Sequence, residues 1–195
     1  MSTTNKRQEQ TQRLVLGAIL TALVIVMQLL GAFIRFGPFS ISLVLVPIVI
    51  GAAMCGWKIG AWLGLVFGAV VMISGDAAAF LAIDVFGTVV TVLLKGTLCG
   101  LAAGLTYKLL NKYNRYLAVI AAAVVCPLVN TGIFLLGCLV FFMSAITEWG
   151  FAEGFNNVAS YMFLGLAGGN FIFEMVTNII LAPVILRVIT FNKNK

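Results

Sequence analysis

The stretch VFGTVVTVLLKGTLCGLAAGL, from Val85 to Leu105, contains a single charged residue, Lys95, about ten positions from either end. Apart from this lysine, the stretch has the length and composition of a helix that crosses the roughly 30 Å hydrocarbon core of a membrane. A charge at that depth costs about 3 kcal/mol on insertion scales, and it usually marks a functional site with a partner. The stretch therefore predicts a membrane protein with a binding site inside it.

The rest of the chain repeats this apolar pattern. Its 195 residues are 62% hydrophobic and 9% charged, and the mean hydropathy is +1.13, well above that of a soluble globular domain. No polar segment is long enough to form a soluble domain between the apolar runs. We therefore predict an all-α integral membrane protein in which residues 1–195 form a single membrane domain. Six transmembrane helices are predicted, at Leu14 to Phe33, Ile41 to Cys55, Ile59 to Ile73, Val85 to Leu105, Tyr116 to Met143 and Ser160 to Ile189.

Basic residues set the predicted orientation. With the N-terminus inside, ten lysines and arginines fall in cytoplasmic segments and only Arg35 falls in an outer loop, which is a clear positive-inside signal. We therefore place both termini in the cytoplasm. The formal net charge of +6 then reflects membrane topology, and we expect no nucleic-acid partner.

Missing residue types exclude several functions. The sequence has no histidine, no GxxxxGK phosphate-binding loop and no CxxC pair, and its four cysteines stand singly in apolar helices. We therefore expect no metal site, no cofactor and no enzymatic activity, and we expect the cysteines to be buried as small hydrophobic residues. Any ATP-hydrolysing domain must belong to another chain.

Polar residues form stripes on three of the predicted spans. Spacings of three and four residues place them on one face of each helix, and counting the rise per residue from the outer ends brings them near a common depth. We predict that they line an internal cavity that binds a small polar ligand. The predicted lining residues are Thr88, Thr91, Lys95, Asn130, Thr131, Asn170 and Glu174.

Two simpler interpretations of these residues stay open. Lys95 and Glu174 could form a structural ion pair, with the asparagines acting as hydrogen bonds between helices. Lys95 could also extend outward along Thr91 and Thr88 and bind nothing. The outer loops could close over a ligand or rest at the membrane interface.

Small residues predict close helix contacts. Glycines recur every four residues in GAWLGLVFG, from Gly60 to Gly68, and in GTLCGLAAG, from Gly96 to Gly104. Such ridges let two helix backbones approach closely, and we expect both to pack within the chain. A sparser pair, Ala18 and Ala22, lies on the first span near the cytoplasmic side, where a partner subunit could approach.

The whole chain resembles the substrate-binding S components of energy-coupling factor (ECF) transporters, which import vitamins into bacteria. The resemblance rests on the six spans, on Ala18-x-x-x-Ala22, on LVLVPIVIGAAMCGWKIGAWLGLVFGAV and on the last helix, GNFIFEMVTNIILAPVILRVI. It implies a multi-pass subunit of the bacterial plasma membrane that topples against a transmembrane scaffold subunit driven by two cytoplasmic ATPases. Ala18 and Ala22 would meet the scaffold, the later helices would form the vitamin pocket, and the loop at Arg35 would act as a gate.

The residue types in the predicted pocket suggest the vitamin. A lysine with asparagine and threonine partners suits a small carboxylate that carries hydroxyl and amide groups, and the sequence looks most like pantothenate-type S components. Folate is the second choice, with Arg35 as an additional cation for its carboxylates, and pyridoxine and biotin also remain open. Few aromatic residues lie near Lys95 on the fourth and sixth spans, which argues against riboflavin and thiamine. A rival hypothesis is a stand-alone secondary carrier in which Lys95 and Glu174 form an ion-coupled relay.

Overall fold

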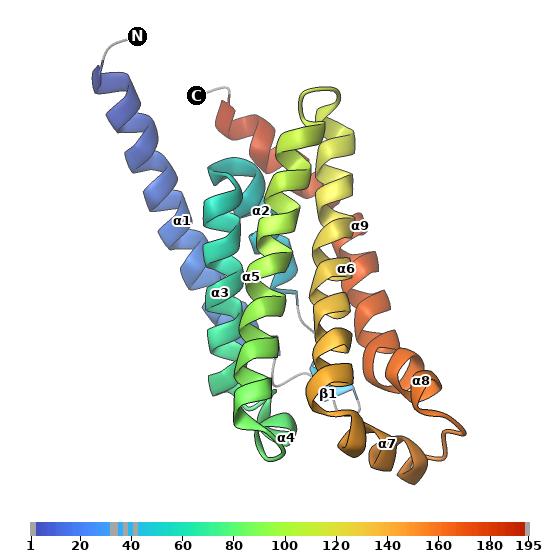
Figure 1. Cartoon of the computed structure of the whole chain (residues 1–195). Helices are drawn as coiled ribbons and strands as arrows, with labels where there is room; N and C mark the ends of the chain where they lie inside the picture. The colour runs from blue at the N-terminus through green and yellow to red at the C-terminus, as the bar shows by residue number, and fades with distance from the viewer. Residues whose placement is uncertain (1–2, 32–34, 37–38, 41–42, 194–195) are drawn as a thin grey trace.

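The computed structural model describes residues 3–31, 35–36, 39–40 and 43–193 (Figure 1). Helices account for almost all of this part of the chain, and a short antiparallel pair of strands matches Arg35 with Ser40 and Phe36 with Phe39. The elements are α1 (Thr3–Gly31), β1 (Arg35–Phe36), β2 (Phe39–Ser40), α2 (Leu45–Cys55), α3 (Trp57–Ser74), α4 (Ala78–Leu81), α5 (Val85–Leu110), α6 (Arg115–Phe141), α7 (Met143–Ala152), α8 (Val158–Ser160), the π-helix η1 (Tyr161–Gly168) and α9 (Gly169–Lys193).

Five helical stretches in the described residues are long and apolar enough to cross a membrane, whereas the sequence analysis predicted six spans. They are Gln10–Gly31, Trp57–Ser74, Val85–Leu110, Arg115–Phe141 and Val158–Arg187. The exception is the second predicted span, where α2 has only 11 residues. At 1.5 Å per residue α2 rises about 16 Å, which is roughly half of the hydrocarbon core.

The ends of the bundle differ in character. Both termini lie at one end, which we call the terminal end, whereas α4, α7, α8 and β1 lie at the other, which we call the distal end (Figure 1). The outer loop predicted between Ser144 and Ser160 is largely helical, because it contains α7 and α8. The outer loop predicted between the third and fourth spans contains the single helical turn α4.

The glycine ridges of α3 and α5 pack within the chain, as predicted, and the structure shows that they pack against each other. A Cβ added at Gly64 would overlap the carbonyl oxygen of Gly96, and a Cβ added at Gly100 would overlap that of Gly60. Only glycine therefore allows this approach, in which backbone contacts backbone with no side chain between. Because Lys95 precedes Gly96 directly, this contact also sets the height of the lysine relative to α3.

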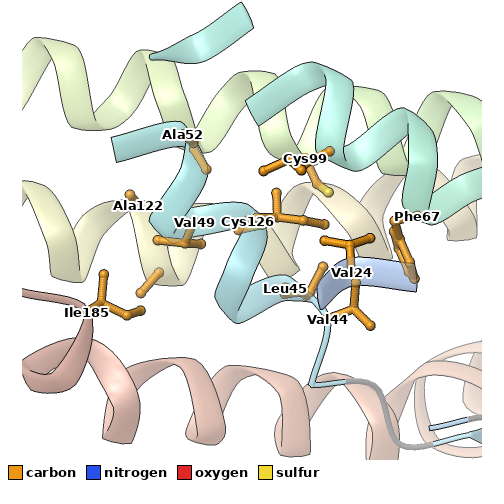
Figure 2. Packing of buried hydrophobic residues seen from close by; sticks show 14 of the residues in the cluster. Val24, Val44, Leu45, Val49, Ala52, Phe67, Cys99, Ala122, Cys126 and Ile185 are labelled. Atoms are coloured by element: carbon orange, nitrogen blue, oxygen red, sulfur yellow. The ribbon is translucent and has the colours of Figure 1, made fainter. Parts of the chain in front are cut away.

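Helix α2 lies in the middle of the bundle and packs against α1, α3, α5, α6 and α9. Buried hydrophobic residues surround it, and Figure 2 shows Val24, Phe67, Cys99, Ala122, Cys126 and Ile185 around Leu45 and Val49 of α2. All four cysteines are buried and unpaired, as expected. A single residue, Gly56, joins α2 to α3 with a φ of 96°, a conformation that favours glycine, so the two helices meet at a tight turn and Trp57 already belongs to α3.

Candidate functional site

A cavity occupies the interior of the bundle on the distal side of α2. Its volume is about 90 Å³. Measured in the same way, one water molecule needs about 10–15 Å³, so the cavity has room for a small ligand or several waters. Residues from α1, α3, α4, α5, α6, η1 and α9 form its wall. The lining residues are Gln28, Phe67, Val71, Asp76, Ala77, Phe80, Thr88, Thr91, Val92, Lys95, Asn130, Thr131, Phe134, Phe142, Leu166, Ala167, Asn170 and Glu174.

Lys95 projects from the middle of α5 to the cavity wall, about 15 Å along the helix from its start at Val85. Its Nζ lies 5.8 Å from the centre of the Phe67 ring and 5.2 Å from that of the Phe134 ring. Within the described part of the chain, no carboxylate oxygen lies within 4.0 Å of Nζ. The contacts of the ammonium group are therefore ring faces, which attract cations through their quadrupoles.

Glu174 is held by amides instead of by the lysine. Its side chain is 2% exposed, and its two carboxylate oxygens accept hydrogen bonds from Asn130 Nδ2 at 3.4 Å and Asn170 Nδ2 at 3.2 Å. The Asn170 bond spans one turn of α9, and the Asn130 bond joins α9 to α6. The ion pair between Lys95 and Glu174, which was one interpretation of the sequence, is not formed: the two groups occupy the same cavity with separate partners.

Several buried polar atoms at the cavity have no hydrogen-bond partner among the described residues. They are Oδ1 of Asn130, Oδ1 of Asn170 and Oγ1 of Thr91. Thr88 differs, because its hydroxyl donates to the backbone oxygen of Asp84 at 2.6 Å. A buried polar atom without a partner is costly, so a ligand with hydroxyl or amide hydrogens would satisfy groups that the protein leaves open.

The distal rim of the cavity combines a polar link with an aromatic cluster. Gln28 Nε2 donates to Asp76 Oδ2 at 2.6 Å, which ties α1 to the turn after α3. Phe80 of α4 lies edge-on to three rings, with centroids 5.6 Å from Phe134, 5.0 Å from Phe142 and 5.6 Å from Trp149. Helix α4 thus packs against α6 and α7 beside the cavity.

The structure brings seven of the eight predicted ligand-binding residues to this one cavity, from Thr88 and Thr91 through Glu174. The eighth is Arg35, whose backbone belongs to β1. The structure does not describe its side chain, so the predicted role of Arg35 stays a prediction. The other eleven wall residues were not predicted, and they include Gln28, Asp76, Phe67 and Phe134. Gln28 had a sequence signal, since it is a polar residue inside an apolar span and is only 2% exposed.

The aromatic content of the cavity corrects one step of the sequence analysis. The scarcity of aromatic residues on the fourth and sixth spans predicts a pocket without rings to stack on riboflavin or thiamine. The rings come from other elements: Phe67 from α3, Phe80 from α4, and Phe134 and Phe142 from α6 and its end. The cavity can therefore offer aromatic contacts, and this reason for dismissing riboflavin and thiamine does not hold.

The two alanines assigned to a partner contact lie on the outer surface of α1. Ala18 and Ala22 are both exposed, and they belong to an exposed apolar face that includes Val15 and Val26. The opposite face of α1 is buried through Leu20 and Val24. Nothing in the described part of the chain covers the alanines, so a second protein can reach them within the membrane.

Comparison with known protein families finds a match over most of the chain. A family model described as "ECF transporter, substrate-specific component" matches residues 12–189, which is nearly the whole chain. No curated protein matches the chain. The matched region contains every described residue of the cavity wall and both exposed alanines of α1.

Proposed function

Because this chain belongs to the family of substrate-specific components of ECF transporters, we propose that it is the high-affinity binding subunit of an importer for a water-soluble vitamin. Family members are transporter subunits and not enzymes, and they work with a membrane module that contains a scaffold and ATPases. The observation that carries the proposal is the family match over residues 12–189 together with a polar cavity inside that same region.

The chemistry of the cavity supports a ligand with one anionic group and several hydroxyl or amide groups. Lys95 supplies the cation, and it does not share its charge with a carboxylate within 4.0 Å among the described residues. Asn130, Asn170 and Thr91 present unpartnered atoms for polar groups of a ligand. Hydrogen bonds to charged groups are about twice as strong as neutral ones, so the lysine would fix the orientation of the ligand.

Pantothenate is our first choice of vitamin, because it is a small, flexible carboxylate with hydroxyl and amide groups. Folate is the second candidate, and the aromatic wall formed by Phe67, Phe80, Phe134 and Phe142 favours its flat ring system. The modest size of the cavity favours the smaller vitamin. Substrate roles are proposed for Thr88, Thr91, Lys95, Asn130, Thr131, Asn170, Glu174 and Arg35.

We also propose the membrane arrangement. The distal end, with α4 and α7, would face the outside of a bacterial plasma membrane, and both termini would lie in the cytoplasm. The scaffold subunit would pack on the exposed face of α1 at Ala18 and Ala22, where small side chains permit close contact between helices. The two ATPases would act through that scaffold.

A thermal-shift screen tests the proposal. The purified chain in detergent would be heated with each member of a panel of water-soluble vitamins at micromolar concentration. A ligand bound with nanomolar affinity should stabilise the fold by about 4 kcal/mol, which is easily detected. Stabilisation by pantothenate alone supports our choice, and stabilisation by another vitamin keeps the function but replaces the ligand. If a folded sample responds to no vitamin and transports a solute without partner subunits, the secondary carrier is the better assignment.

A further inference from the structure

The environment of the Lys95 ammonium group is unusual for a cation inside a membrane-spanning helix. Two ring faces contact it, Phe67 from α3 and Phe134 from α6, with Nζ 5.8 Å and 5.2 Å from their centres. The nearby carboxylate of Glu174 is instead bound by Asn130 and Asn170. The protein thus keeps the cation and the anion of one cavity on different partners.

Each ring is held in place by independent packing. Phe67 is 3% exposed and lies between Gly64 and Gly68, whose backbones contact α5 at Gly96 and Val92. The glycine ridge therefore fixes the height of the ring relative to Lys95.

The second ring, Phe134, is held from the distal side by Phe80, at 5.6 Å and an interplanar angle of 86°. Phe80 in turn packs edge-on against Phe142 and Trp149. Neither ring depends on the lysine for its position, so both are in place before the ammonium group meets a ligand.

Ring faces and carboxylates differ in what they leave for a ligand. A carboxylate partner neutralises the lysine, and an incoming anion would first have to displace it. Ring faces stabilise a cation by roughly 0.5–2 kcal/mol without neutralising its charge, so they orient the ammonium group and leave it able to attract an anion. Such pre-organisation lowers the cost of binding because fewer groups must be ordered or displaced.

We propose that Phe67 and Phe134 are positioning residues that hold Lys95 Nζ at the cavity wall, outside the 4.0 Å ion-pair distance of Glu174, and thereby make the cavity select a carboxylate ligand over its neutral analogue. The inference rests on the function proposed above, because it takes a small-molecule carboxylate as the substrate. It adds two aromatic residues to the anion site, whereas the Glu174 carboxylate is bound by Asn130 and Asn170.

A double-mutant cycle without ligand tests the contact itself. Melting temperatures would be measured for the wild type, Lys95→Met, Phe134→Leu and the double variant. If the ring stabilises the ammonium group, Phe134→Leu should shift the melting temperature less in the Lys95→Met background than in the wild type, whatever the sign of the lysine effect. Equal shifts in the two backgrounds would overturn the proposal. If Phe134→Leu does not fold, Phe67→Leu takes its place in the same cycle.

Binding measurements then test the selectivity. Pantothenate and panthenol, its alcohol analogue, would be titrated against the wild type, Phe134→Leu and Phe142→Leu. Phe142 lines the same cavity, but its ring is not among those over Lys95, so it controls for general loss of packing. We expect Phe134→Leu to weaken pantothenate about 3- to 30-fold while panthenol changes much less, and Phe142→Leu to affect both ligands alike.

The outcomes separate the two proposals. Equal weakening of both ligands by Phe134→Leu would make the ring a packing residue and refute the positioning role. A wild type that binds neither probe, combined with unequal shifts in the ligand-free cycle, would support the ring contact and refute pantothenate as the substrate. Phe134→Tyr, which keeps a ring face, should preserve the preference for the carboxylate.

Discussion

Replacing Gly64 with alanine should separate helices α3 and α5. An ideal Cβ at this position overlaps the carbonyl oxygen of Gly96 and lies 2.7 Å from its carbonyl carbon. Carbon atoms in ordinary contact are about 3.5–4.0 Å apart, so the helices must move by about 1 Å. The obstacle is backbone on α5, so no side-chain rotation can relieve it.

The size of the effect follows from two opposing contributions. Overpacking a close contact costs typically ~1–3 kcal/mol, while alanine gains ~0.5–1 kcal/mol over glycine within a helix. Gly132 on α6 provides a matched control, because a Cβ added there meets no atom within 4 Å. Gly132→Ala should therefore show only the gain, and the two variants should differ by ~1–3 kcal/mol, the overpacking cost alone.

Thermal or denaturant unfolding in detergent, followed by tryptophan fluorescence, measures this difference. Vitamin affinity should fall in Gly64→Ala as well, because the movement shifts Lys95 relative to Phe67, and it should not change in Gly132→Ala. The reasoning would be wrong if the two variants were equally stable, since the backbone contact would then not limit the approach of the two helices.

Three further substitutions test the site and the partner surface. Lys95→Met should abolish binding of an acidic vitamin in a titration while the protein stays folded, and unchanged affinity would make the lysine structural. Glu174→Gln should melt close to the wild type, because its carboxylate has no cation within 4.0 Å among the described residues; a loss of ~3–5 kcal/mol would instead reveal a buried ion pair. Ala22→Leu should change stability by no more than ~0.5 kcal/mol and leave vitamin binding intact, but it should reduce co-purification with the scaffold and ATPases. Ala69→Leu, at an exposed position on α3, should not reduce co-purification. Equal co-purification of the two variants would place the interface away from α1.

The polar stripes could be predicted because helical periodicity determines which residues share a face. Thr88, Thr91 and Lys95 follow one another at spacings of three and four, so once the stretch is helical they must point the same way. Glycines at four-residue spacing likewise share one helix face, which predicts a smooth surface for close packing. The contact between Gly64 and Gly96 lies on that surface.

The aromatic wall could not be predicted in this way. Phenylalanine occurs 15 times in the chain, and an apolar residue in an apolar helix gives no sign of whether it faces lipid, core or cavity. Phe67 and Phe134 reach Lys95 from two other helices, so their role depends on tertiary packing. The partners of Glu174 were open for the same reason: composition shows that a carboxylate is buried, but not which donors are near enough to bind it.

The shortness of α2 has a consequence for permeation. This helix and the apolar core around it form a plug about 16 Å thick between the cavity and the terminal end. Ions and water that enter the cavity meet tightly packed valine, leucine and isoleucine side chains beyond it, and these offer no polar group to replace a hydration shell. Vesicles that contain the chain alone should hold an ion gradient, and a bound solute can reach the other side only if α2 is displaced or the whole subunit turns within the bilayer.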